Sequence, residues 1–419
     1  MKHLVFALSL GLFACGTAWA QDVPARLLRL DVLPAASSVA PPSSAPDYFE
    51  MTGRFAALEG SQAGARTEVL GARAVGGVAS LPALDQAVQG VSAILRERNG
   101  FWALSDNGFG TRRNSADAML MIHRFAVEPD GVARQTTVFL SDPARVVPFA
   151  IVAETHPRRH LTGADFDPES FAPRDGGGFW VGDEFGPYLL EFDARGRLLA
   201  LFDLPDPSLR APENWRGEAG GRIGRSRGLE GMAHSADRRF LYPTLEAPIQ
   251  VDGQMERLDG QAVARIFEFD TQARAFTDRV WFYPLADDAH AIGDITMIGP
   301  STALVIERDG GHGAQAAYKK LQQITLPTGG GMVQRGPSVD LLAIADPDGV
   351  AGARGGNGMY RMPFVTIESV AALPNGQVLV INDNNFPASG ARGNPTPDDT
   401  EIAVISAPGL FDGVTPGSR

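Results

Sequence analysis

The fold is decided by residues 229–246, whose sequence is LEGMAHSADRRFLYPTLE. Two short apolar runs flank a polar turn, with Glu230 near the start of the first run and Glu246 at the end of the second. This pattern predicts a two-stranded β-hairpin. Because a hairpin folds back on itself, the residue that starts its first strand lies beside the residue that ends its second strand. The two glutamates are therefore expected to be neighbours.

Four other segments repeat this pattern and carry polar residues at both ends. They run from Ser92 to Asp106 and Asn107, from Asp165 to Asp183 and Glu184, from Asp294 to Glu307 and Arg308, and from Glu368 to Asp383 and Asn384. The centres of three segments fall on Asn99-Gly100, Pro300-Ser301 and Asn375-Gly376, which are typical turn residues. Spacing and turn chemistry agree, so five hairpins are expected to present their polar ends on one rim.

The repeat predicts an all-β fold, a β-propeller of five or six four-stranded blades. The residues that start the hairpins recur at intervals of 64 to 74 residues, and further strand patterns follow, for example at 188–198, 265–270 and 280–283. Candidate strands at 29–33 and 74–78 either close the ring or contribute to a sixth blade. The alternative is a β-sandwich whose hairpins resemble one another by coincidence.

The N-terminal residues predict export to the periplasm or the medium. A basic start, an apolar run and the sequence Ala18-Trp19-Ala20 are typical of a signal peptide over residues 1–20, cleaved near Ala20. The single cysteine, Cys15, also allows a lipoprotein interpretation. Residues 21–70 are expected to form an extension with a Pro/Ser-rich linker at 34–47, and residues 71–419 the propeller domain.

The formal net charge of −12 argues against nucleic acid or an anionic membrane surface as a partner. Beyond the signal peptide, no segment has the length and apolar character of a membrane span. The partner expected from these properties is a small molecule.

The repeated acids predict a metal site. In a propeller the first strand of each blade lines the central channel, so the acids should converge on one mouth, and crowded carboxylates need cations nearby. Ligand sets made only of oxygen favour calcium, with magnesium possible. The expected metal ligands are Asp106, Glu230, Glu246, Asp294, Glu307, Glu368 and Asp383. Strand-end capping and salt bridges between blades are the simpler explanation for some of these acids.

Three arginines are candidates for binding an anion at this mouth. The guanidinium groups of Arg225, Arg227 and Arg308 could balance the acids or hold a phosphate or carboxylate through two hydrogen bonds. Residues 224–228 also match the G-x-S-x-G nucleophile elbow. That elbow needs a helix after it, whereas a strand is expected here, so Ser226 is not expected to be a nucleophile.

Several of these segments resemble the phytase-like family, which is described as having the esterase-like activity of phytase. The matching segments are LSDNG at 104–108, GADFD at 163–167, WVGDEFGP at 180–187, RGLEGM at 227–232, VIERD at 305–309 and ESV at 368–370. The resemblance covers roughly residues 70–408. It implies a propeller related to calcium-dependent phytases and suggests the hydrolysis of phosphate esters.

The leading hypothesis is therefore an exported, metal-dependent hydrolase of phosphate esters, with calcium as the expected metal. Asp183 or Glu184 would be the general base, and Arg227 and Arg308 would clamp the phosphate. One alternative is a lactonase or carboxyl-esterase with a single calcium ion held by Asn107, Glu230, Asp383 and Asn384. The other is a binding propeller without catalytic activity, in which calcium is structural.

Overall fold

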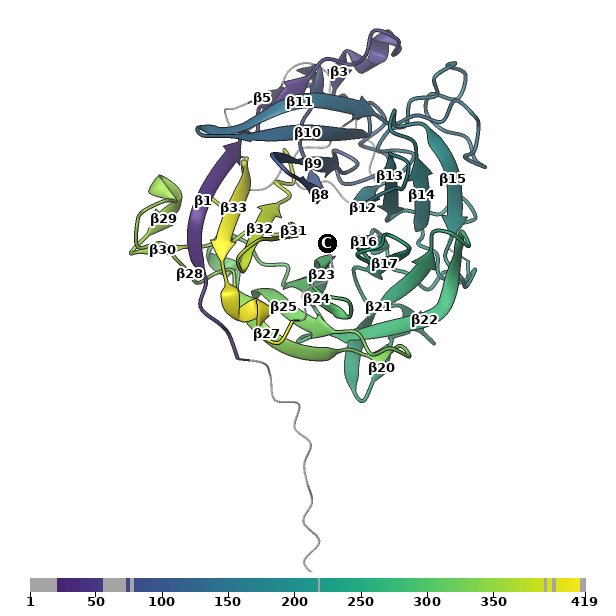
Figure 1. Ribbon diagram of the computed structural model, residues 1–419. Helices are drawn as coiled ribbons and strands as arrows, with labels where there is room; N and C mark the ends of the chain where they lie inside the picture. The colour runs from purple at the N-terminus through teal and green to yellow at the C-terminus, as the bar shows by residue number, and fades with distance from the viewer. Residues whose placement is uncertain are drawn as a thin grey trace, which may run out of the picture.

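The computed structural model describes residues 21–55, 73–75, 79–217, 219–387, 390–393 and 397–414. The regular elements of these residues are β-strands and four short 3-10 helices, η1 (Asp47–Phe49), η2 (Gly313–Gln315), η3 (Gly352–Arg354) and η4 (Pro408–Phe411). The strands form large sheets that stand around a central axis (Figure 1). The predicted all-β, propeller-like architecture is confirmed.

Four large sheets take their main strands in chain order. Sheet 1 contains β8 (Val91–Glu97), β9 (Gly100–Ser105), β10 (Met121–Glu128) and β11 (Gly131–Phe139). Sheet 2 contains β12 (Pro168–Pro173), β13 (Phe179–Asp183), β14 (Tyr188–Phe192) and β15 (Leu198–Asp203). Sheet 3 contains β16 (Leu229–His234), β17 (Phe240–Leu245), β21 (Gln261–Asp270) and β22 (Ala275–Pro284), extended by β20 (Arg257–Leu258) and β26 (Gly331–Met332). Sheet 4 contains β23 (Ala291–Met297), β24 (Thr302–Arg308), β25 (Lys319–Thr325) and β27 (Gln334–Asp340).

Sheet 5 joins the two ends of the chain. It contains β31 (Ile367–Leu373), β32 (Gln377–Asn382), β33 (Thr400–Ser406) and β1 (Arg26–Leu33), extended by β28 (Ile344–Ala345), β29 (Gly355–Gly356) and β30 (Met359–Tyr360). Strand β1 pairs antiparallel with β33 from Arg26 opposite Ser406 to Leu33 opposite Thr400. Figure 1 shows this pairing as the purple strand beside the yellow one. The segment before residue 71 therefore contributes a strand to the ring.

Among the described residues, short strands also form two-stranded sheets outside the five large sheets. The pairs are β2 (Ser38–Val39) with β7 (Gln86–Ala87), β3 (Met51–Thr52) with β6 (Ala83–Leu84), β4 (Arg73–Val75) with β5 (Ala79–Leu81), and β18 (Gln250–Val251) with β19 (Gln254–Met255). Strand β2 of the first pair falls within the predicted linker at 34–47. The predicted signal peptide at 1–20 lies outside the described residues. In the part of the chain that is described, no helix has the length and apolar character needed to cross a membrane.

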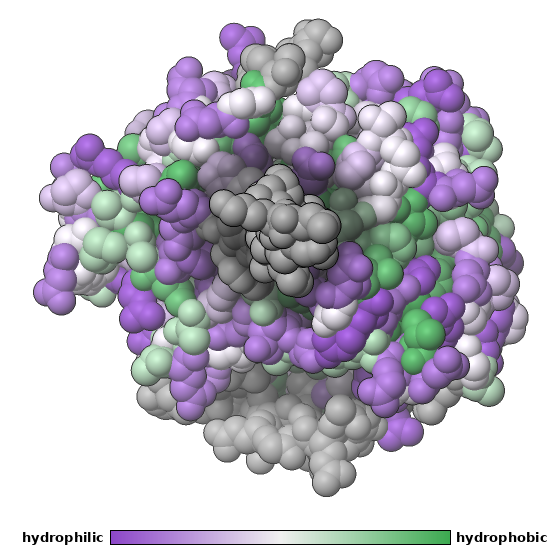
Figure 2. All heavy atoms as spheres, turned by 90° about the horizontal axis from the view of Figure 1, so that it is seen from below, coloured by the Kyte–Doolittle hydropathy of each residue, from purple (hydrophilic) through white to green (hydrophobic). Residues whose placement is uncertain are grey.

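The first strands of the five large sheets contact one another in a closed ring, in the order β8, β12, β16, β23, β31 and back to β8. Apolar cores fill the wedges between neighbouring sheets. Trp102 packs edge-on against Phe179 of sheet 2, and Trp180 packs against Phe269 of sheet 3. This packing fixes the inner strands relative to one another. The outer rim is mainly hydrophilic on the side shown in Figure 2, with hydrophobic residues in small groups.

Each first strand carries a β-bulge at the same place. In sheet 3, Leu229 pairs with Leu245 and Gly231 pairs with Thr244, so Glu230 has no partner across the strand. The same shift of register occurs in the other four hairpins. A bulge adds one unpaired residue and re-aims its side chain. The five bulge positions are Ser92, Glu169, Glu230, Gly293 and Glu368.

The ring closure predicts unequal effects of two adjacent leucines in β1. Leu27 is 1% exposed in the core beneath sheet 5, whereas Leu28 is 40% exposed. Leu27→Ala should lower the free energy of unfolding by about 2–5 kcal/mol, because a buried side chain is lost and a cavity remains. Leu28→Ala is the matched control and should change it by less than about 0.5 kcal/mol. Urea denaturation measures both, and equal effects would show that β1 does not close the ring.

Candidate functional site

The bulges bring two sets of side chains to one mouth of the channel. The first set is the five bulge positions. The second set, which we call the strand-end positions, lies at the end of the second strand of each hairpin. Each member directly follows the residue that pairs with the last first-strand residue before the bulge. The members are Asp106, Glu184, Glu246, Arg308 and Asp383. The strand-end residue is therefore an acid in four of the sheets, whereas in sheet 4 it is the cation Arg308.

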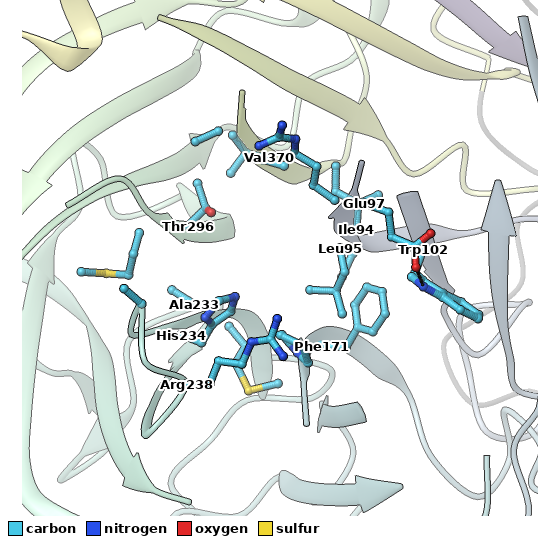
Figure 3. A pocket seen from close by; sticks show the side chains of 18 of the residues that line it. Ile94, Leu95, Glu97, Trp102, Phe171, Ala233, His234, Arg238, Thr296 and Val370 are labelled. Carbon is cyan, nitrogen blue, oxygen red and sulfur yellow. Dashed lines mark hydrogen bonds between the residues drawn. The ribbon is translucent and has the colours of Figure 1, made fainter. Parts of the chain in front are cut away.

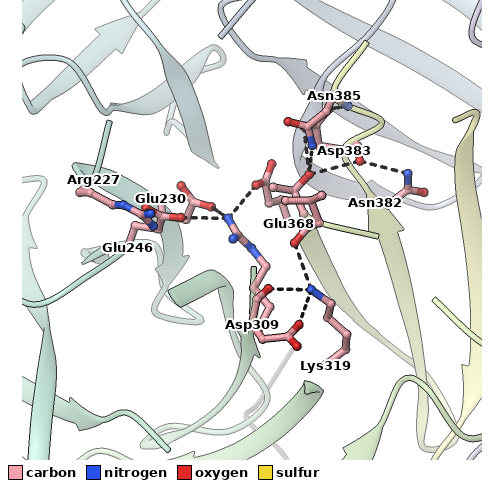
Figure 4. A network of polar contacts seen from close by, with 12 residues as sticks. Arg227, Glu230, Glu246, Asp309, Lys319, Glu368, Asn382, Asp383 and Asn385 are labelled. Atoms are coloured by element: carbon pink, nitrogen blue, oxygen red, sulfur yellow. Dashed lines mark hydrogen bonds and ion pairs between the residues drawn. The ribbon is translucent and has the colours of Figure 1, made fainter. Parts of the chain in front are cut away.

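Arg308 is the central cation of this mouth. Its Nη2 donates hydrogen bonds of 3.0 Å to Glu230, Glu246 and Glu368, which come from sheets 3 and 5 (Figure 4). Arg308 is 6% exposed, so these ion pairs are shielded from water. We expected Arg308 to clamp a substrate anion. The structure instead shows it engaged by three carboxylates, so we remove it from the proposed clamp.

Glycine is required at the bulge of sheet 4. A Cβ atom on Gly293 would lie 2.1 Å from the carbonyl oxygen of Ile367. No side chain fits there, so sheet 4 contributes no acid from its bulge. Lys319 adds a second cation to this side: its Nζ contacts the Asp309 carboxylate at 2.8 Å, and burial lowers its pKa to about 8.

The opposite side of the mouth, formed by sheets 1 and 2, is acidic without a matching cation. Asp167, Glu169 and Glu184 place carboxylate oxygens within 4.8 Å of one another, and Glu184 does the same with Glu230 and Glu246. Among the described residues, no lysine or arginine forms an ion pair with Asp167, Glu169, Glu184 or the adjacent Asp106. The Oε1 atom of Glu184 is buried and has no hydrogen-bond partner among the residues that the structure describes. Asp167, Glu169 and Glu184 are therefore the best candidates to hold a cation.

Burial dominates the electrostatics of these acids. It raises the pKa of Glu169 and Glu184 well above the ordinary value, and neighbouring carboxylates raise both further. It also raises the pKa of Asp167, to about 7. Burial and neighbouring carboxylates also raise the pKa of Asp106 and of Glu368. Without an added cation, several of these acids must therefore keep a proton near neutral pH.

The mouth holds more negative than positive groups. Its acids are Asp106, Asp167, Glu169, Glu184, Glu230, Glu246, Glu368 and Asp383. The arginines that pair with them are Arg308 and Arg227, and both contact acids on the side of sheets 3 and 5. Oxygen ligands in this number suit calcium.

The structure places three predicted site residues elsewhere. Asp294 accepts backbone N–H bonds from Ile295 at 2.7 Å and Val370 at 2.9 Å, so its carboxylate ties two inner strands together. Glu307 points away from the mouth and contacts the Tyr283 hydroxyl at 2.8 Å and Nδ1 of His290 at 2.9 Å. Both are corrected from metal ligands to structural acids.

Asp183 is also a structural acid. Its two oxygens accept the backbone N–H groups of Asp167 at 2.8 Å and Gly186 at 2.7 Å, and it is fully buried. Burial raises its pKa to about 7. We therefore correct its assignment from general base to a residue that positions Asp167.

Asp383 remains at the mouth, where its carboxylate accepts hydrogen bonds from the Thr366 hydroxyl and the Asn385 backbone.

Asp167 and Glu169 were missed because the hairpin of sheet 2 was matched to Asp165. Asp165 instead accepts hydrogen bonds from Thr162 and Val152 in the preceding loop. A local signal was present: Glu169-Ser170, Glu230-Gly231 and Glu368-Ser369 each place a small residue directly after the bulge glutamate. The shared register, rather than the distance between acids, identifies the equivalent residues.

Two arginines stand beside the mouth on the loop before β16. Arg227 pairs with Glu246, and Arg225 pairs with Glu213 at 2.6 Å. Their side chains are 46% and 53% exposed, so both guanidinium groups also face solvent. Ser226 lies between them with a positive φ of 44°, and strand β16, not a helix, follows. The nucleophile elbow is therefore absent at this position.

Comparison with known proteins agrees with the resemblance. The sequence profile described as "Phytase-like: Esterase-like activity of phytase" matches residues 86–386. The chain belongs to the Phytase-like family. This membership suggests a hydrolase.

Other relatives are distant. An uncharacterized secreted protein of Arthroderma benhamiae is 28% identical over 122 residues, which are 25% of this chain and 24% of that protein. A luciferin-regenerating enzyme has a TM-score of 0.37 at 12% identity, covering 80% of this chain and 81% of that one. PorZ of Porphyromonas gingivalis has a TM-score of 0.37 at 14% identity, covering 73% and 33%. These distant similarities say nothing about activity.

The buried acids predict an unusual pH dependence for the Phytase-like chain without metal. The pKa of Asp167 is about 7 in the folded state against an ordinary value of 3.8, so the folded state holds the extra proton between these pH values. The free energy of unfolding should therefore fall from about pH 4 to about pH 7, by about 1.4 kcal/mol per pH unit for each such group, and level off above pH 7. Urea denaturation in chelator measures this slope. A slope of zero or an increase with pH would contradict it.

Proposed function

We propose that this protein is an exported, calcium-dependent hydrolase of phosphate esters whose site is the acidic mouth of the channel. Each of the five large sheets counts as one blade in this proposal. The observation that carries it is the buried group of Asp167, Glu169 and Glu184, which lacks a cationic partner among the described residues. Family membership supports hydrolysis, and the sequence of residues 1–20 together with a relative named as secreted supports export.

Calcium would be held chiefly by Asp167, Glu169 and Glu184. The unpartnered, buried oxygen of Glu184 fits this role, because a buried carboxylate oxygen needs a donor or a cation. Calcium is favoured over magnesium because these carboxylates form a crowded, all-protein cage, whereas magnesium usually keeps several waters. When bound, the ion would polarise a phosphoryl oxygen and lower the pKa of a water ligand.

The protein's own residues would supply the proton acceptor and hold the acidic side chains in position. Glu184 belongs to both acidic groups, so the carboxylate oxygen that does not hold the ion would stand beside it as the general base for a water ligand. Arg308 holds Glu230, Glu246 and Glu368 in place. Asp183 fixes the backbone of Asp167.

Arg227 is the proposed anion clamp. It is half-exposed, contacts Glu246 with one nitrogen, and lies close enough to Glu184 for each charge to affect the other's pKa. Its other N–H groups have no hydrogen-bond partner among the described residues, and they suit the oxygens of a phosphate group. Arg225, on the same loop and also half-exposed, would add a second guanidinium to the entrance.

The single-calcium lactonase is less well supported. It needs the amide oxygens of Asn107 and Asn384. The Asn107 oxygen accepts the backbone N–H groups of Phe109 and Gly110, and the Asn384 oxygen accepts that of Gly90. Both amides are therefore used to hold loops.

Removing one acid of the proposed site should weaken calcium binding and activity together. Glu169→Gln should reduce calcium affinity by at least about tenfold to a hundredfold, since even indirect partners of a metal have effects of this size. Glu128→Gln, at the exposed end of strand β10, is the matched control. Calorimetry measures binding, and p-nitrophenyl phosphate, bis-p-nitrophenyl phosphate and a lactone test turnover with calcium and with EGTA.

Full hydrolysis of the phosphate esters in EGTA would refute the proposal. Calcium binding without turnover of any substrate would support the alternative of a binding propeller with structural calcium. Turnover of the lactone alone would favour the carboxyl-esterase alternative.

A further inference from the structure

A second hollow lies at the other end of the channel. The first strands run from the acidic mouth toward the hairpin turns, and their later residues surround a cavity of about 1050 Å³ (Figure 3). The five hairpins all contribute to its wall. This cavity shares no lining residue with the acids that form the proposed calcium site.

The inner wall of the cavity is largely apolar. Ile94 and Leu95 of β8, Phe171 of β12, Ala233 of β16 and Val370 of β31 line it. Toward the acidic mouth, the carboxylate of Asp294 is held by backbone N–H groups from two strands. A ligand entering from this end therefore meets apolar side chains from four of the five hairpins.

The rim of the same cavity is positively charged. Arg96 and Arg98 of the first hairpin are exposed, and no ion pair is present for either among the described residues. Arg238 approaches Asp175 only at 3.9 Å, and both side chains are largely exposed. Glu97, the acid on this rim, is already paired with Arg124 at 2.7 Å and Trp102 Nε1 at 2.6 Å.

These features combine in one ligand chemistry. An apolar body would fill the interior, and one negative group would meet the arginines at the rim. We propose that this end of the channel binds an amphipathic organic anion, namely a carboxylate with a single long acyl chain. The site is independent of the proposed hydrolase activity, because the two ends of the channel use different residues.

Dodecanoate tests this proposal, with dodecyltrimethylammonium as a control that has the same chain and the opposite charge. Calorimetry below the micelle concentration should show that the wild-type protein binds dodecanoate and not the cation. The double variant Arg96→Gln/Arg98→Gln should weaken binding about tenfold, as expected for two exposed charges. Arg158→Gln, an exposed arginine outside the cavity lining, should leave binding unchanged.

A second variant separates the cavity from the general surface. Thr296 points into the hollow in Figure 3, so Thr296→Trp should narrow it and weaken dodecanoate binding. A urea denaturation midpoint close to that of the wild type shows that the variant is folded. Equal binding of the two surfactants, unchanged binding in the arginine double variant, or undiminished binding in folded Thr296→Trp would each overturn the proposal.

Discussion

The ion pairs between Arg308 and Glu230, Glu246 and Glu368 are the interaction on which the mouth of this channel depends. Buried carboxylates that approach one another are tolerated only with a cation or a proton nearby. Arg308 supplies this cation from the strand-end position that is acidic in the other four sheets. Its effect is confined to one side, so Asp167, Glu169 and Glu184 on the other side still need a positive charge.

The backbone of the ring creates this crowding. Five bulges in equivalent places aim Ser92, Glu169, Glu230, Gly293 and Glu368 toward the same mouth. Gly293 carries no side chain because Ile367 lies too close, and Arg308 from the same sheet extends among the acids. One sheet therefore neutralises part of the charge that the others accumulate. The same channel ends in a hollow with arginines at its rim, so its two ends have opposite polarity.

The sequence predicted the hairpins because their turn residues and strand patterns are local. It predicted Glu230, Glu246, Glu368 and Asp383 at the mouth, since these acids follow the simple rule for the ends of hairpins. It did not predict Asp167 and Glu169, because the nearby Asp165, which precedes the first strand of that hairpin, satisfied the same rule. It also could not distinguish Glu307 from Arg308: adjacent residues of a strand face opposite ways, and only the register decides which one faces the channel.

Anomalous diffraction from crystals grown with calcium would test the central claim most directly. The account predicts an ion between the carboxylates of Asp167, Glu169 and Glu184, with Arg308 still bonded to its three glutamates. The anomalous peak of this calcium ion should be absent from crystals of the Glu169→Gln protein. An ion among Glu230, Glu246 and Glu368 that displaces Arg308, or a mouth without an ion at saturating calcium, would contradict the account.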